Sequence, residues 1–93
     1  MTDEGTLNAT ARIPNKRGLH ARASAKIVEA AARFRSTITV TKDGQSVNAR
    51  SIMGLMMLAA SLGSEIGITV TGPDADEALR AILALIAAKF GEE

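Results

Sequence analysis

Residues 15–26 read Asn-Lys-Arg-Gly-Leu-His-Ala-Arg-Ala-Ser-Ala-Lys and separate two kinds of hydrophobic periodicity. Before this stretch, apolar and polar side chains alternate over residues 6–13, which predicts a half-buried strand. After it, from about residue 20 to residue 35, apolar side chains recur at helical spacing, which predicts an amphipathic helix. Pro14 and Gly18 lie between the two patterns and predict a loop that leads into the helix.

The remainder of the chain repeats these two patterns. Asp43 and Gly44 form a strong signal for a type I′ turn between two short strands, and Ser51 is placed to cap the helix that follows. In chain order, the predicted elements are strands at 36–42 and 45–49, a helix from 52 to about 60, a strand at 65–71, and a helix from 74 or 76 to near 91. The order β-α-β-β-α-β-α predicts a two-layer α+β domain with the helices on one face of the sheet.

The charged residues toward the end of the chain have ordinary interpretations. The acidic residues between 74 and 77 are expected to favour the start of the last helix through its dipole. The side chains expected to form the core stripe of that helix are Leu79, Ile82, Leu83, Ile86 and Phe90. Glu92 and Glu93 are expected to form a solvated tail. We expect residues 1–93 to form a single domain, with residues 1–5 as a flexible N-terminal extension.

The composition excludes several classes of function. The 93 residues include no cysteine and one histidine, which excludes a disulfide framework, a cysteine zinc site and a histidine-rich metal site. A formal charge of +1 and only two aromatic residues argue against nucleic acid as a partner. The chain has no run of about 18 apolar residues for membrane insertion, and its acidic start does not resemble a secretory signal. We therefore expect a cytoplasmic protein.

His20 is the chemically distinctive side chain, because it titrates near neutral pH. It stands where a helix is predicted to begin, and the first turn of a helix offers free N–H groups and the positive end of the dipole to an anion. Arg22 follows it and Arg17 precedes it. This combination suits phosphoryl transfer through histidine. The spacing alone has a second interpretation, which is the more common one in proteins: a histidine that caps a helix beside two solvated arginines.

Residues 15–26 resemble the active-site segment of HPr, the histidine-containing phosphocarrier family of the bacterial phosphotransferase system. A second segment, residues 50–56 (Arg-Ser-Ile-Met-Gly-Leu-Met), resembles the regulatory-serine segment of that family. The two segments occur in the family's order and at its usual separation. The resemblance implies an open-faced β-sandwich, in which three helices cover one face of a four-stranded antiparallel sheet.

The resemblance also implies roles for individual residues. His20 would be phosphorylated on Nδ1 by Enzyme I, which is charged from phosphoenolpyruvate, and Arg22 would help to hold the phosphoryl group. Ser51 would be the serine that HPr kinase/phosphorylase modifies in some bacteria, although a serine at such a place is usually an N-cap. At residue 23 the chain has alanine where many family members have proline. Proline would preset the first helical turn, so its replacement affects the expected geometry of the helix start.

The short helix predicted from residue 52 carries more apolar side chains than one face can bury. Leu55 is assigned to the core. For Ile52, Met53 and Met56, the resemblance implies a patch that docks Enzyme I and EIIA-type acceptors, and flexible methionine suits a surface that fits several partners. Arg17 is placed in the same docking surface. The alternative is a loosely covered core in which methionine fills gaps.

The sequence therefore predicts a monomeric phosphocarrier that takes a phosphoryl group from Enzyme I onto His20 and passes it to an EIIA-type acceptor, without a cofactor or metal. It would not be a turnover enzyme, because it is itself the substrate of its partners. HPr kinase/phosphorylase would be a further partner through Ser51. Three alternatives stay open: a nitrogen-related relay that transports no sugar, a non-catalytic interaction module of the same fold, and a domain that binds a small anion at the helix start.

Overall fold

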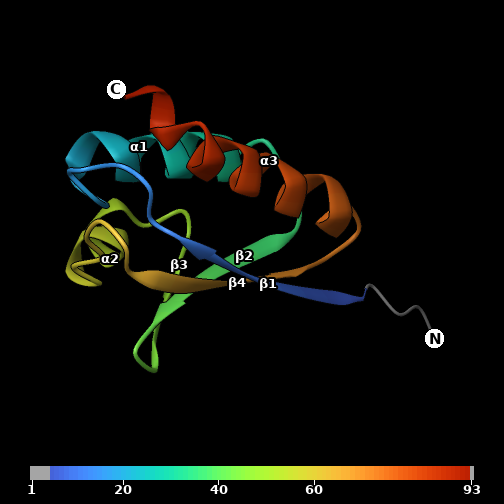
Figure 1. Cartoon of the computed structure of the whole chain (residues 1–93). Helices are drawn as coiled ribbons and strands as arrows, with labels where there is room; N and C mark the ends of the chain where they lie inside the picture. The colour runs from blue at the N-terminus through green and yellow to red at the C-terminus, as the bar shows by residue number, and fades with distance from the viewer. Residues whose placement is uncertain (1–4, 93) are drawn as a thin grey trace.

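The computed structural model describes residues 5–92, and its elements follow the predicted order (Figure 1). The strands are β1 (Thr6–Arg12), β2 (Thr37–Lys42), β3 (Gln45–Asn48) and β4 (Glu65–Thr71). The helices are α1 (Ala21–Ala31), α2 (Ile52–Met57) and α3 (Ala75–Ala87), followed by the 3₁₀ turn η1 (Lys89–Gly91). The extension predicted at residues 1–5 lies, except for Gly5, outside the described residues.

The four strands form one antiparallel sheet in the order β1-β4-β2-β3. Strands β1 and β4 pair over their whole length, from Thr6 opposite Thr71 to Arg12 opposite Glu65. Helices α1 and α3 lie side by side over one face of the sheet, and α2 packs against α1 and β3 (Figure 1). The predicted α+β open-faced sandwich, with its four-stranded antiparallel sheet and three helices, is confirmed.

The alternation along the strands places apolar side chains beneath the helices. The inward residues of the two central strands are at most 3% exposed, and they are Ile38, Val40, Ile66, Ile68 and Val70. Burying each such side chain contributes about 1.5–3 kcal/mol relative to leaving it in water. The opposite face of the sheet carries threonines from β1, β2 and β4 and faces solvent.

The buried stripe of α3 is rotated relative to the prediction. Its buried residues are Ala75, Ala78, Ile82 and Ile86, and Phe90 continues the stripe beyond the helix. Leu79 and Leu83 are only half-buried, because they lie at the rim of this stripe. Alanines occupy the stripe over the first turns of α3. A prediction based on large apolar residues therefore omits them.

Helix α3 ends at Ala87 rather than near residue 91, and the other two helices are also shorter than the periodicity predicts. Helix α1 ends at Ala31, because the Arg50 guanidinium donates to the carbonyl oxygens of Ala31 (3.4 Å) and Phe34 and holds the chain in a turn. Helix α2 ends at Met57, shortly before Ala59 adopts a left-handed backbone with φ of 54°. Apolar residues continue past both points in the sequence, so the periodicity alone does not show where the helices stop.

Asp74, Asp76 and Glu77 lie at the start of α3, as the sequence predicts, but Asp74 has a further role that the sequence does not indicate. Asp74 occupies the N-cap position, but its carboxylate makes no capping bond. The carboxylate instead accepts hydrogen bonds from the Arg35 N–H (2.9 Å), the Ser36 N–H (2.9 Å) and the Ser36 hydroxyl (2.5 Å). Gly72 allows this approach, since a Cβ there would lie 2.5 Å from the Ser36 Oγ. Asp74 thus ties the start of α3 to the loop before β2.

These hydrogen bonds, first the one from the Ser36 hydroxyl and then the one from the Arg35 N–H, lower the pKa of Asp74 below its ordinary value. A carboxyl group whose pKa is lower in the folded state stabilises the fold above its unfolded pKa of about 3.9. That contribution is lost as the pH falls through the lowered pKa of the folded state.

We predict that Asp74→Asn lowers the free energy of unfolding most at neutral pH, and that its difference from wild type shrinks as the pH approaches 2. Urea unfolding over a series of pH values measures this difference. Asp76→Asn is the matched control, because Asp76 is exposed and pairs only with Arg80 on the surface of α3. A difference between wild type and Asp74→Asn that stays constant over the whole pH range would contradict the prediction.

Candidate functional site

The loop before α1 lies directly against the chain that follows α2. The Leu19 N–H donates to the Ala60 carbonyl oxygen at 2.9 Å. Gly18 has a φ of +66°, and a Cβ at this position would lie 2.3 Å from the same oxygen. Glycine alone tolerates both the left-handed backbone and so close an approach. Leu19 is buried, so the residue after it enters α1 from a fixed position.

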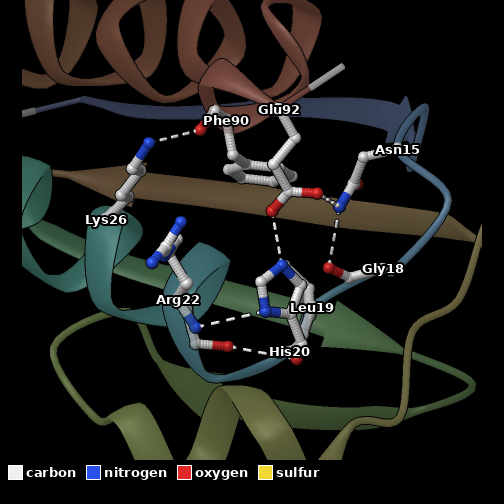
Figure 2. Close-up of polar contacts among 9 residues, drawn as sticks. Asn15, Gly18, Leu19, His20, Arg22, Lys26, Phe90 and Glu92 are labelled. Carbon is white, nitrogen blue, oxygen red and sulfur yellow. Dashed lines mark hydrogen bonds and ion pairs between the residues drawn. The ribbon is translucent and has the colours of Figure 1, made fainter.

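His20 occupies the N-cap position of α1 (Figure 2). Its backbone is extended, with φ of −77° and ψ of −179°, and its Nδ1 accepts a hydrogen bond from the Arg22 N–H at 3.3 Å. The side chain is 24% exposed. The ring therefore lies at the positive end of α1 and can be reached from solvent, as the sequence predicts for a residue at the helix start.

The helix begins regularly although Ala23 replaces the proline of many family members. Ala23 is buried, and Ser24 anchors the first turn through its N–H to the His20 carbonyl (2.9 Å) and its hydroxyl to the Leu19 carbonyl (3.2 Å). These bonds supply the constraint that proline would have imposed on the helix start. Ala23 also carries an N–H that proline lacks.

Glu92 is not part of a solvated tail, which corrects the sequence-based expectation. Its carboxylate points at His20, and its Oε2 lies within hydrogen-bond distance of the ring Nε2 (Figure 2). The Glu92 side chain is 17% exposed. Glu93 lies outside the described residues. The one local signal for this arrangement was Phe90, which is fully buried and anchors the chain two residues before Glu92.

Asn15 is a site residue that the sequence did not reveal. It is fully buried, and its Nδ2 donates to the Gly18 carbonyl (3.0 Å) and to the Glu92 Oε1 (3.0 Å). The bond from Asn15, followed by the bond from His20, lowers the pKa of Glu92 below its ordinary value, so this carboxyl group is ionised at neutral pH. Asn15 thus holds both the loop and the carboxylate that faces the ring.

The two ring nitrogens of His20 have opposite hydrogen-bonding roles. Nδ1 faces an N–H group, which can only donate, so Nδ1 must accept. Nε2 faces an ionised carboxylate, which can only accept, so Nε2 must carry a proton. These partners assign the neutral tautomer with its proton on Nε2 and an unprotonated lone pair on Nδ1.

Four basic side chains, together with Gly91 and Glu92, line a hollow, and the Glu92 carboxylate connects this hollow to the His20 ring. The basic side chains are Lys16, Arg17, Arg22 and Lys26. Arg17 and Arg22 are exposed, and no hydrogen bond holds the Arg22 guanidinium within the described chain. Four basic groups against the one carboxylate of Glu92 give the lining of this hollow a net positive charge, which favours an anion.

Ser51 caps α2, as the sequence predicts, because its hydroxyl oxygen accepts a hydrogen bond from the Gly54 N–H at 2.9 Å. Leu55 is fully buried, as expected. Five large apolar side chains on and shortly after α2 are exposed, and they are Ile52 (40%), Met53 (70%), Met56 (41%), Met57 (67%) and Leu62 (56%). Met57 and Leu62 extend this exposed surface beyond the residues selected from the sequence. Since α2 packs against α1, the surface adjoins the helix that carries His20.

Within residues 5–92, no helix has the length and apolar content to cross a membrane. The same range contains no group of three or more histidine, cysteine, aspartate or glutamate side chains that could hold a metal ion.

Residues 7–88 match the PTS-HPr family, described as the PTS HPr component phosphorylation site. The chain belongs to the HPr family. Members of this family are phosphocarriers of the phosphotransferase system. The HPr match ends at residue 88, so Glu92 lies beyond it.

HPr proteins of known identity align with this chain over most of their length. The phosphocarrier protein HPr of Cupriavidus necator is 54% identical over 80 residues, which covers 86% of this chain and 90% of that protein. HPr of Neisseria meningitidis serogroup A is 50% identical over 86 residues, covering 92% and 97%. The crystal structure of HPr-C-His from Thermoanaerobacter tengcongensis has a TM-score of 0.90 at 47% identity and covers 94% of this chain and 98% of that one.

Proposed function

We propose that this HPr-family protein receives a phosphoryl group from Enzyme I on Nδ1 of His20 and transfers it to an EIIA-type acceptor protein. The observation that carries the proposal is the state of the His20 ring, whose Nδ1 accepts the Arg22 N–H at 3.3 Å and therefore has an available lone pair. An unprotonated imidazole nitrogen is the nucleophile that this reaction needs. The protein acts as a monomer in the cytoplasm.

The transfer forms one bond and breaks one bond. The Nδ1 lone pair attacks phosphorus and forms an N–P bond, while the bond from phosphorus to the donor atom of Enzyme I breaks and leaves its electron pair on that donor. The Arg22 N–H, which holds the lone pair before the attack, becomes available to a phosphoryl oxygen. Transfer to the acceptor is the same kind of step, with His20 as the leaving group.

Positive groups beside the ring compensate the charge of the bound phosphoryl group. Arg22 contributes its guanidinium as well as its N–H, and charge-assisted bonds from guanidinium to phosphate oxygens are strong and directional. Lys16, Arg17 and Lys26 line the same hollow and raise its positive potential. The N-terminus of α1 adds the partial positive charge of its dipole.

We predict that Enzyme I and labelled phosphoenolpyruvate place an acid-labile, base-stable label on the wild-type protein, and that His20→Ala takes up none. His20 is the only histidine in the chain, so a phosphohistidine has only this place to form. Arg22→Ala should slow the transfer, whereas Arg33→Ala, just after the C-terminal end of α1, should not. Scintillation counting after rapid quenching measures the rate.

The alternatives give different results in that assay. An interaction module would take up no label while it still binds its partner. An anion-binding domain would bind inorganic phosphate in His20→Ala but not in Arg22→Ala. A nitrogen-related relay would use the same His20 chemistry with another donor, and the NPr of Shewanella violacea is 45% identical to this chain over 80 residues. Comparing Enzyme I of the sugar system with its nitrogen-related counterpart as donor distinguishes these two branches.

The exposed side chains on α2 form the docking surface in this proposal. Ile52, Met53 and Met56 present apolar area beside α1. An apolar patch on a small monomer marks a contact site, and methionine adapts to more than one partner. Arg17, which is exposed on the loop before His20, supplies a positive charge to the docking surface in this proposal.

We predict that Met53→Asp keeps the fold, since the Met53 side chain is 70% exposed, but lowers the rate of transfer from Enzyme I by about tenfold or more. Circular dichroism checks the fold and the labelling assay checks the rate. Gln45→Asp adds the same charge at the exposed end of the hairpin and should change neither. A Met53→Asp protein that fails to fold would assign Met53 to the core instead.

Ser51 is the regulatory site in this proposal, because its hydroxyl lies at the start of the helix that carries the docking surface. A phosphate there would add roughly −1.5 to −2 charges. At a helix N-terminus this charge favours the helix, so the modification would act on partners rather than on the fold.

We predict that Ser51→Asp, which retains a capping carboxylate, accepts phosphoryl from Enzyme I much more slowly than wild type. Ser51→Ala is the matched variant, because it removes the cap without adding charge. It should cost about 1 kcal/mol of stability and leave the transfer rate close to that of wild type. Equal transfer rates for wild type and Ser51→Asp would remove the regulatory role.

A further inference from the structure

We propose that Glu92 is a positioning residue for the phosphocarrier reaction: its carboxylate keeps the proton on Nε2 of His20 and thereby leaves Nδ1 free to attack phosphorus (Figure 2). The inference rests on the proposed function of His20. The HPr family match ends at residue 88, four residues before Glu92.

The chain after α3 is shaped to bring Glu92 to the ring. Lys89, Phe90 and Gly91 all have positive φ values, of 56°, 56° and 77°, so the backbone turns sharply after the helix. Phe90 is fully buried, and its carbonyl accepts a hydrogen bond from the Lys26 Nζ at 2.5 Å (Figure 2). Two non-glycine residues in a left-handed conformation are held in place by this anchor and this bond. The turn therefore has a defined geometry that aims the next side chain at α1.

Asn15 fixes which carboxylate oxygen faces the ring. Its Nδ2 donates to the Glu92 Oε1 at 3.0 Å, which leaves Oε2 for the Nε2 of His20. The same Nδ2 also donates to the Gly18 carbonyl at 3.0 Å. Rotating the Asn15 amide would place its own oxygen against that carbonyl, so the amide has only one favourable orientation.

The charge balance of the reaction gives the carboxylate a second effect. When neutral His20 attacks through Nδ1, phosphorus is bound at Nδ1, the proton stays on Nε2, and the ring becomes positively charged. Lys16, Arg17, Arg22 and Lys26 face the same hollow and oppose a further positive charge. Glu92 places its negative charge directly against the Nε2 proton and offsets this repulsion, much as a carboxylate stabilises the imidazolium of a serine-protease triad.

The consequence is an unusual order of variant effects. In Glu92→Gln, the amide oxygen must face the Asn15 donor, so the amide NH₂ faces Nε2 of the ring. An NH₂ group forces Nε2 to accept, which moves the ring proton to Nδ1 and blocks the nucleophile. In Glu92→Ala, nothing opposes the Nε2-protonated ring, and the Arg22 N–H still favours it. Glutamine, the closest replacement in shape, should therefore be the more damaging one.

The test uses the full chain as wild type, Glu92→Gln, Glu92→Ala and the control Glu29→Gln, which changes an exposed glutamate on α1. We expect the rate of transfer from Enzyme I to His20 to fall by about tenfold or more in Glu92→Gln and by less in Glu92→Ala. Long-range ¹H–¹⁵N NMR of the neutral ring should show an unprotonated Nδ1 in wild type and Glu92→Ala, and a protonated Nδ1 in Glu92→Gln. The control should match wild type in both measurements.

Two outcomes would overturn the inference. If Glu92→Gln matches wild type while Glu92→Ala is slow, the Glu92 side chain supports the site only by filling space and not through its carboxylate. If neither variant changes the rate or the protonated nitrogen, Glu92 has no role at the ring. Failure of the proposed function is recognised separately, because wild type itself would then take up no label while the NMR measurement still reports the state of the ring.

Discussion

The close approach of Gly18 to Ala60 connects the loop that leads to His20 with the chain that follows the exposed surface of α2. The two loops are connected by further main-chain bonds, from the Ile13 N–H to the Ser64 carbonyl (2.9 Å) and from the Gly63 N–H to the Ile13 carbonyl (2.8 Å). If partners dock on α2, as we propose, each would meet the imidazole at a fixed position. Phosphoryl transfer between two proteins needs this alignment, since small displacements of reacting atoms reduce rates strongly.

The features that could be predicted from the sequence are those determined by neighbouring residues. Periodicity predicts the seven helices and strands, and the Asp43-Gly44 pair predicts its hairpin turn, in which both residues have positive φ values of 50° and 80°. Ser51 caps α2 through a bond to a residue only three positions away. The position of His20 at a helix start is local for the same reason. In each case the partners lie within one turn of chain.

The features that could not be predicted depend on partners far apart in the sequence. Glu92 lies 72 residues from His20 and 77 from Asn15, and Asp74 lies 38 from Ser36. An acidic residue near a chain end or a helix start has an ordinary solvated interpretation, and nothing in the local pattern indicates a distant donor. Both carboxylates connect segments that the fold brings together, and their lowered pKa values follow from those hydrogen bonds.

A phosphocarrier must bind its phosphoryl group well enough to receive it and loosely enough to pass it on. One additional strong charge-assisted bond, worth about 1.5–3 kcal/mol, would slow the release by roughly ten- to a hundredfold. Arg22 is exposed, so in the proposed function it would give up side-chain freedom to hold the group, which limits the stabilisation. Glu92 acts on the other side of the ring. In the proposed mechanism, keeping the proton on Nε2 would let His20 depart from phosphorus as a neutral imidazole, a far better leaving group than the imidazolate that a deprotonated ring would become.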